Sequence, residues 1–393
     1  MNSDLEQLVA KAWASGVGHE ECPLVGIECL DSHLQGHAFK YSEQGPHLRG
    51  VYPYRLTFRD QFGKVGSVDA MLKAKPDQAS MFRIYGGLLK ACGITPVTPV
   101  AELLRYTDYA KPNLKEAVLF RDYEPRLAPY LPQSLGVLID GEYTLRLEKK
   151  LAPGSLILSP DDDTTKRWQS TFPELVLNGL AEMHARFLDN YSDLIATGYF
   201  FVYDRQVMTE GLELWKGFHD FLFTRNGGVL DSVHAARHRT IIDTLPDWYA
   251  LADQQPKTLL YGDVNPQNLA FARTESGFQL SVFDWERAVI SLPQRDMIEQ
   301  LIYTLPIEFE AQNALNQMES YRAKLGHRTG RTTERGSFLR GCAWMLCDLI
   351  INRLPLMMIV KHLTGKRPHS TEAYGNAQRL LGQLMAMDIG VHF

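Results

Sequence analysis

The sequence is poor in the residues that stabilise secreted proteins and build zinc sites. Its 393 residues include five cysteines, an odd number, and no C-x-x-C pair. A disulfide framework needs an even set of cysteines and a structural zinc site needs closely spaced ones, so neither is expected. A reducing, cytoplasmic location fits this composition best. Cys342 and Cys347 lie in an apolar helical stretch, where we expect them to be packing residues.

We also expect no signal peptide and no membrane span, because apolar runs of the required kind are missing. The N-terminus, M-N-S-D-L-E-Q-L-V-A-K-A-W, has early acids and no apolar core of signal-peptide length. The most apolar region, residues 338–363, contains Arg340, Asp348, Arg353 and Pro355, and charged residues are rare inside membrane spans. We therefore expect no membrane association and a buried or partner-facing helix in this region.

An excess of positive charge is absent as well. Lys and Arg number 41 against 46 Asp and Glu, which gives a formal net charge of −5 and implies no general affinity for nucleic acid. Internal repeats and low-complexity segments are missing too. The hydrophobic content of 45% is ample for a core, and the length suggests two or three domains or lobes.

The chemistry is concentrated in one stretch, residues 258–286. It begins T-L-L-Y-G-D-V-N-P-Q-N-L and ends V-F-D-W-E. The pattern predicts a strand, a polar loop, a second strand, a turn at Glu275–Gly277 and a returning strand. Such a hairpin returns Asp284 to the neighbourhood of Asn268, so we expect the oxygen-bearing side chains of Asp263, Asn268 and Asp284 to converge.

These three side chains have a chemical use in phosphoryl transfer. That reaction needs a carboxylate that accepts or orients the hydroxyl proton and oxygen ligands that hold magnesium on the nucleotide phosphates. Magnesium prefers hard oxygen ligands and often takes only one or two from the protein. Asp263 lies five residues before Asn268, and Asp284 follows on the returning strand. The stretch therefore supplies the required groups.

The motifs Y-G-D-V-N-P-Q-N-L and V-F-D-W-E resemble the H-G-D-x-x-x-x-N and I-D-W-E motifs of the aminoglycoside phosphotransferase and choline kinase group. These are small-molecule kinases with a protein-kinase-like fold. The resemblance implies an α+β, bilobal protein, with a small antiparallel β-sheet in the N-lobe and a larger, mainly helical C-lobe. It implies ATP and Mg²⁺ as cofactors, Asp263 as catalytic base, and Asn268 and Asp284 as magnesium ligands. Tyr261 departs from the family's usual His.

The resemblance also places the lobes. We expect a nucleotide-binding lobe over residues 1–147 with a helical insertion near 77–112, a hinge at 148–154, and a catalytic and substrate-binding lobe over 155–393. Backbone groups of the hinge residues Glu148, Lys149 and Lys150 are expected to bind adenine. A polar turn that contains Gly45 and Gly50 is expected to cover the phosphates. An ordinary hairpin turn remains the alternative there.

A lysine should pair with the α and β phosphates. Lys73 and Lys75 lie on one predicted strand and point to the same face, because side chains alternate. We assign Lys73, since L-K-A-K-P resembles the family's K-x-x-P strand ending, and keep Lys75 as the alternative. The segment N-L-K-E-A-V-L-F-R-D-Y resembles a helix of ecdysteroid-kinase-like members that supplies a bracing Glu. Glu116 is the first candidate and Glu124 the second.

Two residues near these motifs are expected to be structural. The segment L-A-E-M-H-A-R-F resembles the central helix of the family's large lobe, and we expect His184 there to be a satisfied core histidine. The segment P-Q-R-D resembles the P-x-x-D pattern that begins the helical tail, and Asp296 is expected to be structural.

The charge of the C-terminal region bears on the acceptor. Residues 321–393 hold eleven Lys and Arg but only four acids. Cations near a binding site disfavour a polycationic ligand and suit a carboxylate or phosphate. We therefore expect a small-molecule acceptor that is neutral or anionic, with Arg340 and Arg353 as the residues that point inward. A solvated helix face is the alternative. A peptide Ser/Thr kinase and a non-catalytic nucleotide-binding scaffold are the alternative functions.

Overall fold

The computed structural model describes residues 3–16, 18–19, 21–30, 50–75, 78–94, 99–122, 125–140, 143–151, 156–157, 171–224, 230, 234–275, 277–365 and 369–391. The chain forms two compact units, each made of three segments. The first comprises Met1–Met81, Lys111–Asp162 and Gln267–Glu286, and the second comprises Phe82–Ala110, Asp163–Pro266 and Arg287–Phe393.

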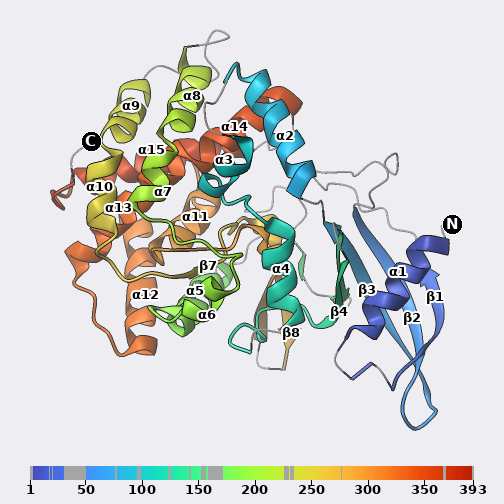
Figure 1. The fold of residues 1–393 in the computed structure, drawn as a ribbon. Coiled ribbons are helices and arrows are strands. Elements are labelled where there is room, and N and C mark those ends of the chain that lie inside the picture. Colours follow the sequence, from blue (N-terminus) through green and yellow to red (C-terminus); the bar gives the residue numbers. More distant parts are fainter. Residues whose placement is uncertain are drawn as a thin grey trace. The chain divides into compact units, whose positions relative to one another are not determined.

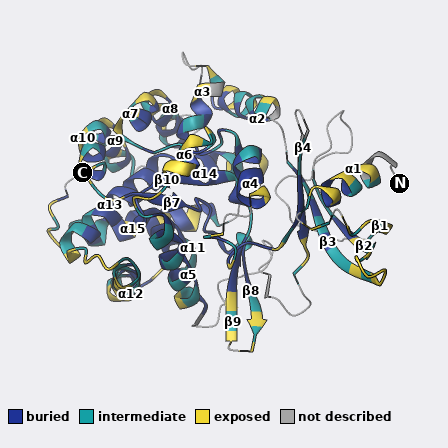
Figure 2. Cartoon of the chain, turned by 60° about the horizontal axis from the view of Figure 1, so that its bottom comes forward, coloured by how far each residue is buried: buried dark blue, intermediate teal, exposed yellow. Residues whose placement is uncertain are grey.

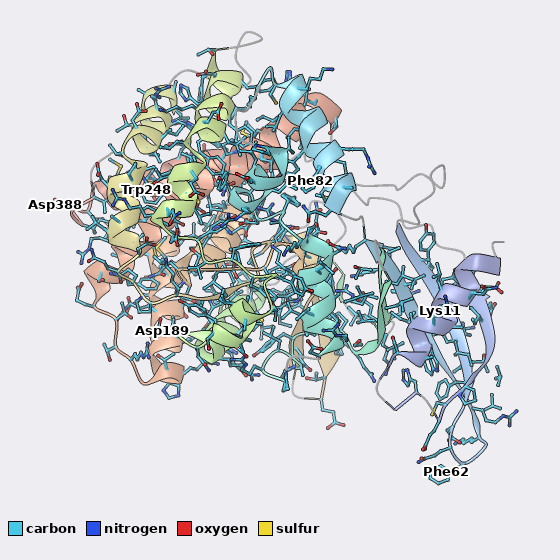
Figure 3. The ribbon with its side chains drawn as sticks, viewed as in Figure 1. Lys11, Phe62, Phe82, Asp189, Trp248 and Asp388 are labelled. Carbon is cyan, nitrogen blue, oxygen red and sulfur yellow. The ribbon has the colours of Figure 1, made fainter. Side chains whose placement is uncertain are left out.

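The first unit is built around an antiparallel sheet of five strands in the spatial order β1-β2-β3-β5-β4. Figure 1 shows helix α1 lying against this sheet, and helix α4 belongs to the same unit. Phe62 lies at the tip of the β2–β3 hairpin and is 85% exposed (Figure 3). The elements are α1 (Ser3–Ala14), β1 (Leu24–Cys29), β2 (Gly50–Arg59), β3 (Val65–Lys75), α4 (Pro112–Arg121), β4 (Ser134–Asp140) and β5 (Tyr143–Lys149).

One face of the five-stranded sheet is apolar and packs against α1. Successive side chains of a strand point to opposite faces, so the buried residues recur at every second position. On β3 these are Ala70, Leu72 and Ala74, and on β5 they are Leu145 and Leu147. Helix α1 and the neighbouring strands complete this core with Val9, Ala12, Trp13, Tyr54, Leu56 and Leu135.

The other face of the same strands is charged. The alternation that buries the apolar residues places Lys73 and Lys75 of β3 there, together with Arg146 and Glu148 of β5. Lys73 lies opposite Arg146 in the β3–β5 ladder. The prediction that both lysines share a face is confirmed, since Ala74 between them points into the core.

Helix α1 approaches β4 closely at Gly136. This residue has a φ of +156°, and a Cβ atom there would lie 1.8 Å from the carbonyl oxygen of Ala12. A side chain at this position would push α1 away from the sheet, so the close approach requires glycine.

A second, three-stranded sheet in the first unit carries the predicted hairpin. Its order is β6-β8-β9, formed by β6 (Leu156–Ile157), β8 (Leu269–Thr274) and β9 (Gly277–Val282). Strands β8 and β9 are antiparallel, and their exposed tip is yellow in Figure 2. The backbone N–H of Phe283 donates to the carbonyl oxygen of Asn268 at 3.2 Å. The predicted return of the chain to Asn268 is therefore confirmed.

The second unit is mainly helical and contains one short antiparallel pair, β7 (Thr258–Leu260) with β10 (Val289–Ser291). Helix α2 (Gln78–Ala91) begins in the first unit and continues into the second. The other helices are α3 (Val100–Tyr106), α5 (Thr171–Phe187), α6 (Ser192–Ala196), α7 (Arg205–Glu210), α8 (Leu212–Phe223), α9 (Ala235–Asp243), α10 (Leu245–Ala252), α11 (Gln294–Thr304), α12 (Ala311–Thr329), α13 (Arg335–Ile351), α14 (Arg353–Thr364) and α15 (Ser370–Met385). The predicted α+β class, with a small antiparallel sheet and a larger helical part, is confirmed.

The most apolar stretch of the sequence forms helices in the core of the second unit. The region Arg335–Thr364 is long and apolar enough to cross a membrane, yet 94% of its most apolar window is buried inside the structure. Figure 2 colours most of α13 and α14 as buried. Cys342 and Cys347 are fully buried, and burial raises the pKa of both thiols. The prediction that they are packing residues is confirmed.

The compact units do not follow the predicted lobe boundaries. Residues Phe82–Ala110, most of the expected insertion, pack with the second unit, and Gln267–Glu286 pack with the first. The compact units are defined by how the segments pack, whereas the expected lobes are defined by the function of each part. The boundaries at residues 147 and 155 therefore stay a prediction.

Candidate active site

The charged face of the five-stranded sheet centres on Lys75, the last residue of β3. Its ammonium nitrogen Nζ donates to Asp284 Oδ1, lies 3.0 Å from Glu286 Oε2 and lies 3.4 Å from Glu116 Oε2. All four residues belong to the first unit. We call Lys75, Glu116, Asp284 and Glu286 the lysine cluster. One cation is thus surrounded by three carboxyl groups. The excess of negative charge favours the binding of a further cation at this cluster.

The expected pairing of Lys73 with Glu116 is corrected by these contacts. Lys73 Nζ lies 2.9 Å from Glu148 Oε1, and the residue that pairs with Glu116 is Lys75. The two lysines share a face but lie two residues apart along β3, so they meet different carboxylates. The contacts therefore favour Lys75 as the partner of Glu116, while the assignment of the phosphates to Lys73, with Lys75 as the alternative, stays a prediction.

Arg146 of β5 joins the two carboxylates that the lysines use. Its guanidinium contacts Glu116 through Nη1 and lies 2.8 Å from Glu148 Oε2 through Nη2. All three side chains are almost fully buried. Burial alone would raise the pKa of Glu116, but the charges of Arg146 and Lys75 outweigh it and lower that pKa. Glu116 is therefore ionised and fixed on α4, where it braces Lys75.

Asp284 follows β9 and has an unusual backbone. Its φ of +75° lies in the left-handed region, which few residues other than glycine adopt. Such strain collects at functional sites. Burial would raise the pKa of Asp284, but Lys75 and Lys73 outweigh it and lower the pKa below the usual range. The carboxylate is 35% exposed, so it is an ionised oxygen donor open to solvent.

The residues of this region fit a magnesium ion that phosphate oxygens help to hold. Asp284 has a charged oxygen. The backbone of Asn268 lies beside this segment, because its carbonyl oxygen accepts from the N–H of Phe283, and its side-chain amide is of a type that magnesium accepts as a ligand. Glu286 has a raised pKa because of burial and the charges of Asp284 and Glu116, despite Lys75. Within the described ranges, no three His, Cys, Asp or Glu side chains form a group that could hold a metal by themselves.

The predicted catalytic loop lies in the second unit and is held by Asp296. One carboxylate oxygen of Asp296 accepts from the backbone N–H of Tyr261 at 2.7 Å, and the other accepts from that of Gly262 at 3.0 Å. His184 is fully buried, with Nε2 3.2 Å from the same carboxylate and Nδ1 2.6 Å from the hydroxyl of Tyr321. The structural roles expected for His184 and Asp296 are confirmed.

Gly262 permits the turn that precedes Asp263. Its φ is +79°, and a Cβ atom there would lie 2.6 Å from the carbonyl oxygen of Arg287. Both the backbone conformation and the space exclude a side chain. The chain therefore turns sharply into Asp263.

Asp263 is almost buried and lies among groups of both signs. Its Oδ1 atom accepts from Asn265 Nδ2 at 2.5 Å and from Arg353 Nη2. The Arg353 guanidinium also contacts Glu299 through Nε, and Glu299 Oε2 accepts from the backbone N–H of Val264 at 3.2 Å. All of these residues belong to the second unit. We call Asp263, Asn265, Glu299 and Arg353 the base cluster.

The other residues predicted to contact the nucleotide lie only in part within the described ranges. Gly45 and Glu124 lie outside the described residues, and Gly50 begins β2 opposite Ala74. The backbone N–H of Lys149 donates to the carbonyl oxygen of Gln133 at 2.9 Å, and that of Lys150 donates to the carbonyl oxygen of Asp69 at 2.8 Å. These two N–H groups therefore already form hydrogen bonds within the protein. The Glu148 carboxylate forms ion pairs with Lys73 and Arg146. Adenine recognition by this segment stays a prediction.

Sequence reasoning missed Arg146 and the partners of Arg353. The segment T-L-R-L-E carries a charge between two core leucines, and strand alternation would have placed Arg146 beside Lys73. Arg353 was expected to point inward and is fully buried, whereas Arg340 is only half-buried. Nothing in the sequence indicates that Arg353 meets Asp263, because 90 residues separate them.

No protein-family model matches the sequence, and no curated protein matches it either. Solved structures do align with the chain. A microcompartment-associated aminopropanol kinase aligns with a TM-score of 0.47 and 13% identity over 96% of this chain and 98% of that one. The GDP complex of aminoglycoside 2'-phosphotransferase-IIIa aligns with a TM-score of 0.46 and 10% identity over 98% and 100%.

A choline/ethanolamine kinase family protein from Mesorhizobium loti aligns with a TM-score of 0.45 and 13% identity over 87% of this chain and 92% of that one. At these identities and scores, the functional argument rests on the residues themselves.

Proposed function

We propose that this protein is a magnesium- and ATP-dependent phosphotransferase that moves the γ-phosphate to a hydroxyl group of a small molecule. The observation that carries the proposal is the lysine cluster. An ionised aspartate in a left-handed backbone conformation meets a lysine that is braced by a buried glutamate. Phosphotransferases with a kinase-like site use these groups for the metal and for the phosphates.

We assign each side chain of the site a role in this reaction. Lys75 binds phosphate oxygens, Glu116 and Arg146 hold its position, and Asp284 with Asn268 holds the metal. When bound, Mg²⁺ neutralises charge on the phosphates. Asp263 accepts the proton of the acceptor hydroxyl as that oxygen forms a bond to the γ-phosphorus. The bond from this phosphorus to the bridging oxygen breaks, and ADP leaves with the electron pair.

We propose that the acceptor is neutral or anionic, and the contacts of the C-terminal cations favour a neutral one. Lys324 contacts Glu174, Arg331 Nη1 lies 2.6 Å from Asp189, and Arg322 Nε lies 2.9 Å from Glu319. Arg353 is paired with carboxylates too. Five of the eleven Lys and Arg of residues 321–393 thus have a carboxylate partner in the part of the chain that the structure describes, namely Arg322, Lys324, Arg328, Arg331 and Arg353. A cytoplasmic location also remains our proposal.

Two variants test the assignment of roles. Asp263→Asn should lower the rate of transfer by a factor of at least about 100, because general-base catalysis contributes roughly 10²–10⁴-fold. Its affinity for Mg·ATP should stay near that of the wild type, since the base acts on the acceptor. Asp284→Ala should instead weaken Mg·ATP binding, measured by calorimetry with and without magnesium. Wild-type turnover in Asp263→Asn, or equal ATP binding with and without magnesium, contradicts the assignment.

A further inference from the structure

The buried guanidinium of Arg353 is the feature of the second unit that the proposed function leaves unexplained. Arg353 begins α14 and is 1% exposed. Isolated charges are very costly to bury, so a buried arginine is retained only with partners. Its partners are the carboxylates of Asp263 and Glu299. One of these is the proposed catalytic base.

The other charged groups near Asp263 have their own partners. Arg287 Nη2 lies 2.9 Å from Asp108, and Arg295 Nη2 lies 3.1 Å from the same carboxylate. Arg295 Nε also lies 2.6 Å from Asp348. Asp296, on the same helix, is engaged by His184 and by the loop N–H groups. The guanidinium of Arg353, by contrast, bonds the Asp263 carboxylate directly.

Glu299 gives the base cluster a second carboxylate. Burial and the neighbouring charge of Asp263 raise the pKa of Glu299 well above its usual value, despite Arg295 and Arg287. Two carboxylates that share one site cannot both ionise easily. A cation between them favours ionisation, and Arg353 bonds both.

We propose that Arg353 is a positioning residue for the proton-accepting step, which rests on the proposed function of Asp263. Its guanidinium fixes the Asp263 carboxylate at Oδ1 and keeps that carboxylate ionised beside Glu299. Glu299 in turn ties Arg353 to the loop through the N–H of Val264. Arg353 therefore does not bind an anionic acceptor, because its guanidinium is already in contact with Asp263 and Glu299.

The test compares Arg353→Gln, Arg353→Lys and the control Arg322→Gln, whose arginine pairs with Glu319 on its own helix. The first readout is the pKa of Asp263, followed by NMR on protein with ¹³C-labelled aspartate carboxyls. The Asp263 signal is assigned by its loss in Asp263→Asn. Without Arg353 this pKa should rise by about one to three units, because an adjacent opposite charge lowers a carboxyl pKa by that amount. Arg322→Gln should leave it unchanged.

The second readout is the pH profile of kcat with the acceptor that a metabolite screen identifies. Asp263 must be deprotonated to accept a proton, so the acidic limb in Arg353→Gln should move to higher pH, with Mg·ATP affinity unchanged. Arg353→Lys keeps the charge but loses the planar fork, so its acidic limb should stay in place while kcat falls roughly tenfold. If Arg353→Gln does not fold, the kcat of Arg353→Lys still tests the inference.

The outcomes separate this inference from the proposed function. An unchanged Asp263 pKa and an unchanged acidic limb in folded Arg353→Gln overturn the inference, and so does wild-type kcat in Arg353→Lys. Full turnover in Asp263→Asn overturns the proposed function instead, whatever the Arg353 variants do.

Discussion

At the scale of single residues, Lys75 is the centre of the lysine cluster. One ammonium group meets three carboxylates, of which Asp284 is ionised and Glu286 has a raised pKa. Lys73 meets Glu148 and lies 5.5 Å from the ring centroid of Phe283. We therefore propose Lys75 as the lysine that exchanges a carboxylate for a phosphate while Glu116 keeps it in place.

Lys75→Met should lower kcat/KM for ATP by roughly 10- to 100-fold, because a hydrogen bond to a charged group contributes about 1.5–3 kcal/mol. Lys73→Met is the matched control on the same strand and should have the smaller effect. Steady-state kinetics with varied ATP measures both, and thermal unfolding of each variant checks that it is folded. A larger loss at Lys73 would return the phosphate-binding role to that residue.

At the scale of elements, β5 combines core packing with the bracing of the site. Leu145 and Leu147 face the core, while Arg146 and Glu148 face the lysines. The two functions are separated only by strand alternation, so a shift of one residue in register would exchange them.

Arg146→Met should destabilise the protein by about 3–5 kcal/mol, because removing one partner of a buried ion pair leaves uncompensated buried charge. The control is Arg55→Met on β2, whose pair with Asp69 is exposed and should contribute at most about 1 kcal/mol. Urea unfolding of the two variants gives both values. Equal losses of stability would show that the Arg146 contacts do not hold the sheet face together.

The sequence predicts the elements near the motifs well. Turn residues and apolar alternation are local signals, so the β8–β9 hairpin, the lysine strand and the buried helices α13 and α14 follow from them. The partner of Glu116 does not, because both lysines satisfy the same alternation and only the packing of α4 distinguishes them. The contact between Arg353 and Asp263 is equally hidden, since it depends on how helices distant in sequence pack.

At the scale of the whole molecule, five of the eleven cations of residues 321–393 have carboxylate partners among the described residues. These cations meet acids of the second unit, such as Glu174 on α5. The net charge of −5 is therefore not the sum of one acidic and one basic surface. This matching is the reason that a neutral acceptor is favoured over an anionic one.

The central claim, transfer of phosphate from ATP to a small-molecule hydroxyl, is tested most directly by following the phosphate itself. The protein is incubated with Mg·ATP and pooled hydroxylated metabolites that are neutral, acidic or polycationic, with Asp263→Asn as the matched blank. We expect a magnesium-dependent phosphate mass gain on a neutral or acidic member of the pool, and none with Asp263→Asn. Tight Mg·ATP binding without transfer to any hydroxyl would contradict the claim, and equal transfer by Asp263→Asn would contradict its mechanism.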